Sequence, residues 1–401
     1  MQHSTTSQPA ALELACPPIP TVRIAIVGVG QRGIKTIARY AHIDHAEIVA
    51  IADLTGEQFP KAQALLADTG RPTAATYVGR DAARSVCALP YVDVVMICTD
   101  WFSHTPIALM AMEAGKHVAV EVPAAMSMAE CIRLIETAER TRRHCFMLEN
   151  CCFDPFALST LHIARQGLLG SIKHCEGAYH HNLYITAEGK TDPVYHWMRG
   201  NYPYSGGNAY PTHGIGPIAH LLNIHRGDRF TELYSISSTP HSELPQRVCT
   251  VMLRTMSGRT VMLQLDVHTP RPYSRLQTVC GTEGYASKYP LPTLRLSGMT
   301  TEAVGEEALT LAKTHEHPSA APFMAEALRK GVENEMNYIM DARFIYCLRH
   351  GLPLDIDVYD AAEWSCVNHL SAISEERNAP VPFPDFTQGR WNVLREHTLY
   401  I

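Results

Sequence analysis

The spacing of apolar residues along the chain changes near residue 150. Before that point, short and nearly continuous apolar runs alternate with segments whose apolar residues recur at helical spacing. Continuous apolar runs are typical of parallel strands that are buried on both faces of a sheet. The strands expected from these runs cover residues 22–27, 47–52, 91–98, 117–121 and 144–149. Their alternation with helices predicts a doubly wound parallel sheet in an α/β domain.

After residue 150, strand-like segments follow one another with few helices between them. They cover residues 172–180, 230–238, 247–254, 259–268 and 275–280, and helices are expected over 156–166, 323–349 and 360–376. This order favours a C-terminal α+β domain with a large, mostly antiparallel sheet. The predicted organisation is an N-terminal tail over 1–20, a first domain over 21–150, a second domain over 151–377 and a C-terminal tail over 378–401.

The composition is that of an ordinary globular protein. The 401 residues carry a formal net charge of −6 and no basic run, which argues against a nucleic-acid partner.

No apolar stretch is long enough to span a membrane, and the N-terminal residues lack the regions of a signal peptide, so we expect a cytoplasmic location for the chain as written. The 12 cysteines form no C-x-x-C pair and no group with zinc-site spacing, which predicts buried thiols and no metal. The exposed face of a large sheet leads us to expect a homo-oligomer.

A glycine-rich turn follows the first apolar run and precedes a helical segment. Gly28, Gly30 and Gly33 form the pattern G-x-G-x-x-G, in which the glycines allow a tight turn, close approach of a pyrophosphate, and close packing of helix on strand. The second strand ends at Asp53, 20 residues after Gly33. An acidic side chain there would hold a ribose 2′-hydroxyl and repel a 2′-phosphate. The first domain is therefore predicted to have a Rossmann fold that binds NAD rather than NADP.

Polar and aromatic side chains follow other strands of the predicted parallel sheet. In such sheets, ligands bind at the carboxyl ends of the strands. The side chains expected at that edge, besides Asp53, are Trp101, His104, Glu121, Glu149 and Asn150.

The second domain contains one unusual stretch, residues 205–217, which is rich in glycine and proline. Tyr210 and His213 are three residues apart in it, so on a helical turn they would share a face. Histidine is a natural acceptor for a hydroxyl proton when hydride leaves the same carbon. A structural loop with a buried histidine is the alternative. Two further segments, 176–181 and 269–275, are typical of recognition loops, although each tyrosine in them could equally serve packing.

Several motifs together resemble one glycosidase family. The first half is similar to the glucose–fructose oxidoreductase and inositol dehydrogenase superfamily, but Glu121-Val122-Pro123 stands where most members have Glu-Lys-Pro with a catalytic lysine. The combination with Trp101-Phe102-Ser103-His104, Leu148-Glu149-Asn150, Tyr210-Pro211-Thr212-His213-Gly214 and Thr269 to Arg275 resembles glycoside hydrolase family 109, from about residue 20 to the end of the chain. Members of that family are NAD-dependent α-N-acetylgalactosaminidases.

The resemblance implies roles for individual residues. Besides the motif glycines, the implied NAD contacts are Gln31, Arg32, Asp53, Thr99, Trp101, His104, Glu121, Val122 and Asn150. The implied sugar contacts are Tyr179, Arg199, Tyr210, His213 and Tyr273, where Arg199 matches the family only by approximate spacing. Many members begin with a twin-arginine export signal that this chain lacks, and export stays open for a trimmed N-terminus.

The family chemistry implies a redox route to hydrolysis, in which tightly bound NAD is regenerated at each turnover. Oxidation at sugar C3 acidifies the C2 proton, loss of that proton expels the C1 substituent, water adds, and hydride returns to C3. We expect His213 to handle the C3 hydroxyl proton and Tyr179 the C2 proton, with Tyr210 assisting. Glu149 is expected either to act as a base or to orient the sugar. The alternatives are the same mechanism on another glycoside or anomer, a net NAD-dependent sugar dehydrogenase, and a non-catalytic NAD-bound sensor.

Overall fold

A computed structural model describes residues 10–185, 189–238, 247–332 and 335–393. The outer parts of the two predicted tails, residues 1–9 and 394–401, lie outside the described residues. The chain divides into two compact units. Unit 1 comprises residues 1–148 and 341–362, and unit 2 comprises residues 149–340 and 363–401. The sequence analysis placed residues 151–377 in one continuous second domain. It did not anticipate that residues 341–362 belong to unit 1.

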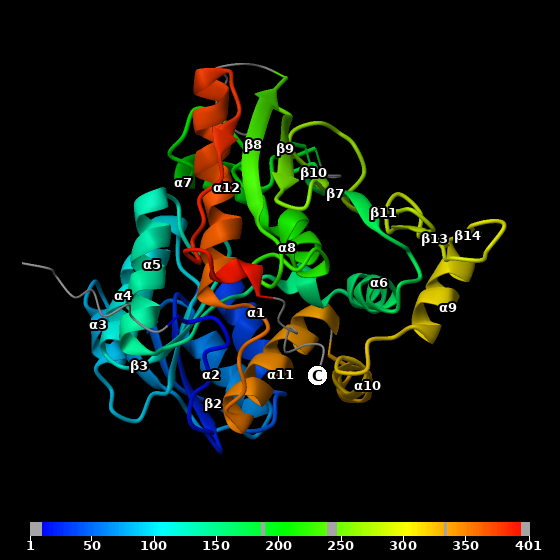
Figure 1. The fold of residues 1–401 in the computed structure, drawn as a ribbon. Coiled ribbons are helices and arrows are strands. Elements are labelled where there is room, and N and C mark those ends of the chain that lie inside the picture. Colours follow the sequence, from blue (N-terminus) through cyan, green and yellow to red (C-terminus); the bar gives the residue numbers. More distant parts are fainter. Residues whose placement is uncertain (1–9, 186–188, 239–246, 333–334, 394–401) are drawn as a thin grey trace, which may run out of the picture. The chain divides into compact units, whose positions relative to one another are not determined.

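Unit 1 contains a six-stranded parallel sheet with strand order β3-β2-β1-β4-β5-β6 (Figure 1). The strands are β1 (Val22–Val27), β2 (Ala46–Asp53), β3 (Ala75–Val78), β4 (Val94–Ile97), β5 (His117–Val120) and β6 (Cys145–Met147). The helices are α1 (Gln31–Tyr40), α2 (Phe59–Asp68), α3 (Ala82–Cys87), α4 (Trp101–Glu113) and α5 (Met128–Thr141). The predicted doubly wound Rossmann sheet is confirmed.

Local sequence explains most of these boundaries. Every residue of β4 and β5 is buried, as their continuous apolar runs predict. A capping box precedes α5: the Ser127 hydroxyl accepts from the Glu130 amide at 3.3 Å, and the Glu130 carboxylate accepts from the Ser127 amide at 3.1 Å. The edge strand β3 and the short helix α3 were not predicted. Strand β3 is mostly exposed and lacks an apolar run, so hydrophobic patterning gives no indication of it.

Unit 2 contains a nine-stranded mixed sheet with order β14-β13-β12-β11-β7-β10-β9-β8-β15 (Figure 1). Its longer strands are β7 (Ile172–His180), β8 (Phe230–Ser237), β9 (Cys249–Thr255), β10 (Thr260–Asp266) and β11 (Ser274–Gly281). Short strands complete it: β12 (Tyr285–Ser287), β13 (Thr293–Arg295), β14 (Ala303–Val304) and β15 (Val381–Pro382). Strands β7 and β10 pair in parallel and the other pairs are antiparallel, which confirms the predicted mostly antiparallel sheet.

The helical elements from residue 149 onward are η1 (Asn150–Phe153), α6 (Pro155–Arg165), α7 (Pro193–Asn201), α8 (Thr212–Leu221), α9 (Glu306–Thr314), α10 (Ala321–Lys330), α11 (Glu335–His350), α12 (Val358–Arg377) and η2 (Arg390–Asn392). The single helix predicted over 323–349 is wrong. Helix α10 ends at Lys330 because Gly331 adopts a left-handed conformation with φ of 63°. A left-handed glycine is a common helix terminator, so the helical pattern on its two sides belongs to two helices.

Candidate active site

The glycine-rich turn in unit 1 has the geometry that the motif requires. Gly28 has φ of 89°, and a Cβ atom there would lie 2.6 Å from the carbonyl oxygen of Cys98. A Cβ atom on Gly33 would lie 2.1 Å from the Gly28 carbonyl oxygen. A Cβ atom on Gly30, in contrast, would meet no atom within 4 Å. Gly28 and Gly33 therefore let the turn and α1 pack closely, and Gly30 leaves space at the amino end of α1, where a pyrophosphate fits.

Asp53 ends β2 and binds the glycine-rich turn. Its carboxylate accepts from the Val29 amide at 2.7 Å and from the Thr55 amide at 3.0 Å. Burial alone would raise the pKa of Asp53, but these backbone hydrogen bonds outweigh it and lower the pKa. A fixed, ionised carboxylate at this position fits a ribose diol and disfavours a phosphate.

The other residues predicted to contact NAD in unit 1 lie on helix starts and strand ends. Arg32, in the first turn of α1, forms an ion pair with Glu121 at 3.2 Å between Nε and Oε1. Helix α4 begins at Trp101, and Asp100 caps it by accepting from the Ser103 amide at 3.1 Å. Gln31, Thr99 and Val122 belong to the same set of turns. These residues are thus arranged along the carboxyl ends of β1, β4 and β5.

His104 and Trp101 are almost completely buried, each with 1% of its surface exposed. The two ring nitrogens of His104 face the carbonyl oxygens of Pro123, at 2.7 Å, and Thr99, at 3.1 Å. Burial lowers the pKa of His104, which favours its neutral form. The histidine therefore connects the loops that follow β4 and β5, and its predicted contact with NAD stays a prediction.

Glu149 and His213 form the centre of the candidate site in unit 2. The ring Nδ1 of His213 lies 2.7 Å from Oε1 of Glu149, which also accepts from the Cys151 amide at 3.0 Å. The Glu149 side chain has no exposed surface and that of His213 has 10%. Because Nδ1 faces the carboxylate, Nε2 is the ring nitrogen left to act on a ligand.

The two residues titrate as a coupled pair. Burial would raise the pKa of Glu149, but contact with His213 lowers it. Burial lowers the pKa of His213, whereas the neighbouring Cys151 and Glu149 raise it to about 10. The arrangement therefore favours an ionised carboxylate next to a protonated imidazole.

Three glycines bring His213 to Glu149. A Cβ atom on Gly177 of β7 would lie 2.4 Å from the Gly214 carbonyl oxygen, and one on Gly214 would lie 2.9 Å from the Ala178 amide. A Cβ atom on Gly216 would lie 2.8 Å from Sγ of Cys152 and 3.0 Å from Cγ of Glu149. Glycine at these positions is what allows α8 to lie directly against β7 and η1.

Tyrosines surround His213 in unit 2. The ring centroids of Tyr179 and Tyr210 are 4.9 Å apart, and those of Tyr210 and His213 are also 4.9 Å apart. The Tyr179 ring lies 5.4 Å from that of His213 and 6.3 Å from that of Tyr273. Tyr210 and His213 lie close together, as their spacing predicts, and Tyr179 and Tyr273, which the resemblance also implied as sugar contacts, lie beside them.

Two other predicted site residues have different surroundings. Arg199 is exposed in the last turn of α7, and its role as a sugar contact stays a prediction. Asn150 is buried, and its side-chain amide donates to Oδ1 of Asn337 at 2.7 Å. This hydrogen bond fixes the orientation of the Asn150 side chain, whose expected contact with NAD is likewise untested.

Sequence reasoning missed two residues of this cluster. Cys151, interpreted as a packing thiol, directly follows the Glu149-Asn150 motif and lies beside His213. His181 accepts from or donates to the Tyr179 hydroxyl, with 2.8 Å between Oη and Nδ1. The sequence contained two indications of these contacts. Cys151 is close to Glu149 in the chain, and Tyr179 and His181 lie two residues apart, on one face of an extended segment.

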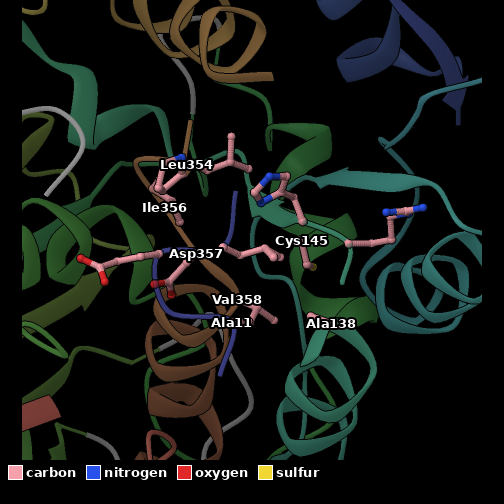
Figure 2. Close-up of a pocket in the computed structure, with 12 residues that line it drawn as sticks. Ala11, Ala138, Cys145, Leu354, Ile356, Asp357 and Val358 are labelled. Carbon is pink, nitrogen blue, oxygen red and sulfur yellow. The ribbon is translucent and has the colours of Figure 1, made fainter. Parts of the chain in front are cut away.

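A separate small pocket lies in unit 1, and Figure 2 shows side chains around it. Its lining includes Ala11, Ala138, Cys145, Leu354, Ile356 and Val358. The Ala11 amide donates to the Tyr359 hydroxyl at 3.1 Å, so the pocket lies where the N-terminal segment packs. None of the predicted cofactor or sugar residues lines it, and we assign it a structural role only.

Two family descriptions match the chain. Residues 22–149 match "Oxidoreductase family, NAD-binding Rossmann fold", and residues 156–244 and 245–393 match "Glycosyl hydrolase 109, C-terminal domain". The first match supports NAD binding by unit 1, in agreement with the geometry of its glycine-rich turn.

Curated relatives match over the whole chain. An alpha-N-acetylgalactosaminidase from Bacteroides fragilis is 47% identical, with 99% of this chain and 100% of the relative covered. A glycosyl hydrolase family 109 protein from Phocaeicola vulgatus is 48% identical, with 96% and 99% covered.

Solved structures share the fold at low identity. A levoglucosan dehydrogenase in complex with NADH and levoglucosan has a TM-score of 0.71 and 16% identity, covering 91% of this chain and 99% of that one. An aldose–aldose oxidoreductase from Caulobacter crescentus, complexed with glycerol, has a TM-score of 0.66 and 19% identity, covering 90% and 99%. Among the described residues, no helix is both long and apolar enough to cross a membrane.

Proposed function

The chain belongs to glycoside hydrolase family 109, and from that premise we propose that it removes terminal α-linked N-acetylgalactosamine with NAD as a regenerated cofactor. Full-length identity of 47% to a curated alpha-N-acetylgalactosaminidase supports this choice of substrate. The structural observation that carries the proposal is the buried Glu149–His213 pair among three tyrosines. Such a group can move protons on a sugar, which is the work a redox glycosidase leaves to the protein.

When bound, NAD supplies a hydride acceptor that takes hydrogen from sugar C3 and returns it after cleavage. We infer that it stays tightly bound, because a cofactor restored at each turnover has no need to exchange. Gly30 at the amino end of α1 and the ionised Asp53 are the residues that would hold its pyrophosphate and ribose.

His213 handles the proton of the C3 hydroxyl. Its Nδ1 is held by Glu149, so Nε2 accepts the hydroxyl proton and later donates it back to the C3 oxygen. The raised pKa of His213 suits the donating step, and the accepting step becomes faster as rising pH removes the ring proton. Glu149 thus acts as a positioning residue that also stabilises the charged ring.

Tyr179 removes the C2 proton once C3 is a ketone. Its hydroxyl lies 2.8 Å from Nδ1 of His181, which can accept the phenolic proton. Burial lowers the pKa of His181, so the ring is available in the neutral, accepting form at neutral pH. Tyr210, Tyr273 and Arg199 would contact the sugar around this proton path, and loss of the C2 proton expels the C1 substituent.

The proposal is tested with purified protein and no added cofactor. The protein is incubated with p-nitrophenyl α-N-acetylgalactosaminide while nitrophenolate and NADH absorbance are followed together. We expect nitrophenolate release without net NADH. In deuterated water, the released sugar should carry deuterium at C2, because the C2 proton exchanges before water adds.

Two results would contradict the proposal. Accumulation of NADH from a free sugar and added NAD, with no nitrophenolate, would identify a net sugar dehydrogenase. Release without deuterium at C2 would identify ordinary hydrolysis. Release of nitrophenolate only from another sugar or anomer would support the proposed mechanism and contradict the proposed substrate.

A further inference from the structure

Three ligand-type side chains converge beside the candidate proton-transfer pair. Glu149, Cys151 and His213 each present one donor atom, and these atoms all lie within 4.8 Å of one another. Glu149 and Cys151 come from the segment after β6, whereas His213 comes from the start of α8, more than sixty positions later. The sequence spacing of metal-binding motifs therefore could not reveal this group, and the sequence analysis predicted no metal.

A second observation concerns an unused oxygen in the same group. Oε2 of Glu149 is buried and makes no well-formed hydrogen bond among the residues that the structure describes, and the Thr212 hydroxyl, which lowers the pKa of this carboxyl group, is the neighbouring donor. Buried polar atoms are nearly always satisfied, so an orphaned carboxylate oxygen needs an explanation. The other oxygen, Oε1, already accepts from the Cys151 amide and faces His213.

We propose that Glu149, Cys151 and His213 form a binding site for a soft divalent cation such as Zn²⁺. A thiolate, an imidazole and a carboxylate are the ligands that Zn²⁺ prefers, and three protein ligands leave a fourth position for water or a ligand oxygen. On binding, the Cys151 thiol releases its proton to solvent and its sulfur bonds to the metal. The cation also displaces the proton shared by His213 and Glu149, which likewise leaves to solvent, and it holds both groups.

Charge balance at the site is compatible with a divalent cation. The thiolate of Cys151 and the carboxylate of Glu149 together supply two negative charges. Arg275, whose charge acts on Cys151, is itself bound to Asp154 at 2.6 Å between Nη2 and Oδ2. Asp154 also forms an ion pair with Lys288, so its carboxylate compensates only one of these two positive charges, and both Arg275 and Asp154 are buried.

The cation is expected to inhibit the enzyme. This consequence rests on the proposed function, because inhibition follows only if His213 must move a proton during turnover. Metal binding itself does not depend on the reaction. The two parts therefore need separate measurements.

Binding is measured with Co²⁺ on the NAD-containing, reduced full-length protein. Cobalt bound to a thiolate gives a ligand-to-metal charge-transfer absorption, which excess Zn²⁺ should remove by displacement. We expect the absorption in the wild type and in Cys152→Ser, the matched control at the adjacent buried thiol. It should be lost in Cys151→Ser, and absence from the wild type or persistence in Cys151→Ser would overturn the proposed site.

Inhibition is measured by titrating Zn²⁺ against nitrophenolate release, with each variant compared with its own metal-free rate. We expect reversible inhibition relieved by a chelator, with the half-inhibiting Zn²⁺ concentration raised roughly tenfold or more in Cys151→Ser and unchanged in Cys152→Ser. Equal sensitivity of the two variants, or loss of activity on chelation with recovery on adding Zn²⁺, would overturn the inhibitory role. If the protein shows the cobalt absorption but cleaves no glycoside, the metal site is supported and the proposed function is contradicted.

Discussion

The candidate cofactor site in unit 1 and the proposed proton-transfer group in unit 2 are built on different principles. On the cofactor side, turn residues within a short segment define the geometry, and the important groups are backbone amides and the absence of Cβ atoms. On the proton-transfer side, the important groups are side chains from four distant segments around Glu149, Tyr179, Tyr210–His213 and Tyr273. The first is a local conformation, whereas the second exists only after the sheet and α8 have packed.

This difference has a consequence for substitutions. A cofactor site made of backbone tolerates most side-chain changes but not an added Cβ atom. The proposed proton-transfer group, in which Glu149 is fully buried and Tyr273 is exposed, depends on single functional groups, while its fold tolerates their conservative replacement. The following substitutions test this contrast, from the largest expected effect to the smallest.

His213→Ala should lower kcat by about 10³-fold, the middle of the range for loss of a general acid–base group. Bound NAD should change little, whereas the melting temperature should fall, because Glu149 is left as a buried carboxylate without its partner. His174→Ala, on the same strand as Tyr179 but half-exposed, is the matched control and should keep its activity. Steady-state kinetics on the nitrophenyl glycoside provide the measurement. Near-wild-type turnover of His213→Ala would remove this residue from the mechanism.

Gly28→Ala should lower the free energy of unfolding by about 2 kcal/mol, because its backbone lies in a glycine-specific region and its Cβ atom would meet Cys98. Gly30→Ala is the matched variant, since its Cβ atom has open space. It should leave the unfolding free energy unchanged and reduce NAD retention. Denaturant unfolding and cofactor content after gel filtration distinguish the two. Equal destabilisation by both variants would contradict the role given to Gly30.

Glu149→Gln should shift the pH dependence of turnover to lower pH. Cys151 and the Glu149 carboxylate together raise the pKa of His213 to about 10, so the neutral ring is populated only at high pH. Removing that charge lowers the pKa, and the rise in kcat with pH should begin earlier. The measurement is a kcat–pH profile of both proteins with the same NAD content. A profile that stays in place or moves to higher pH would show that Glu149 does not control His213.

Asp53→Asn should reduce the preference for NAD over NADP by about tenfold, equivalent to roughly 1.4 kcal/mol of lost charge repulsion. The isosteric amide keeps one acceptor oxygen, so it retains one of the two hydrogen bonds from the Val29 and Thr55 amides, which reach different oxygens of Asp53. Cofactor-depleted protein is titrated with each dinucleotide and the two affinities are compared. An unchanged ratio would mean that another group sets the preference.

The sequence predicted the two sheets well and some helices poorly. Continuous apolar runs in the sequence identified β1, β4 and β5, because a strand that is covered on both faces has to be apolar throughout. The exposed strand β3 left no such pattern. The helix break at Gly331 was missed. A single glycine within a helical pattern can either be tolerated inside the helix or end it, and the sequence pattern does not show which.

The sequence by itself determined those features of the site that are formed by residues close together in the chain. The glycine-rich turn and Asp53 act over a few residues, so their spacing predicted the NAD-binding fold, and the family was indicated by the resemblance of several motifs, including Tyr210–His213. Only the tertiary structure decided which carboxylate holds His213 and that Cys151 joins the same group. These contacts of His213 depend on how closely α8 approaches β7 and η1, which is set by glycines far apart in the chain, and no local pattern contains that distance.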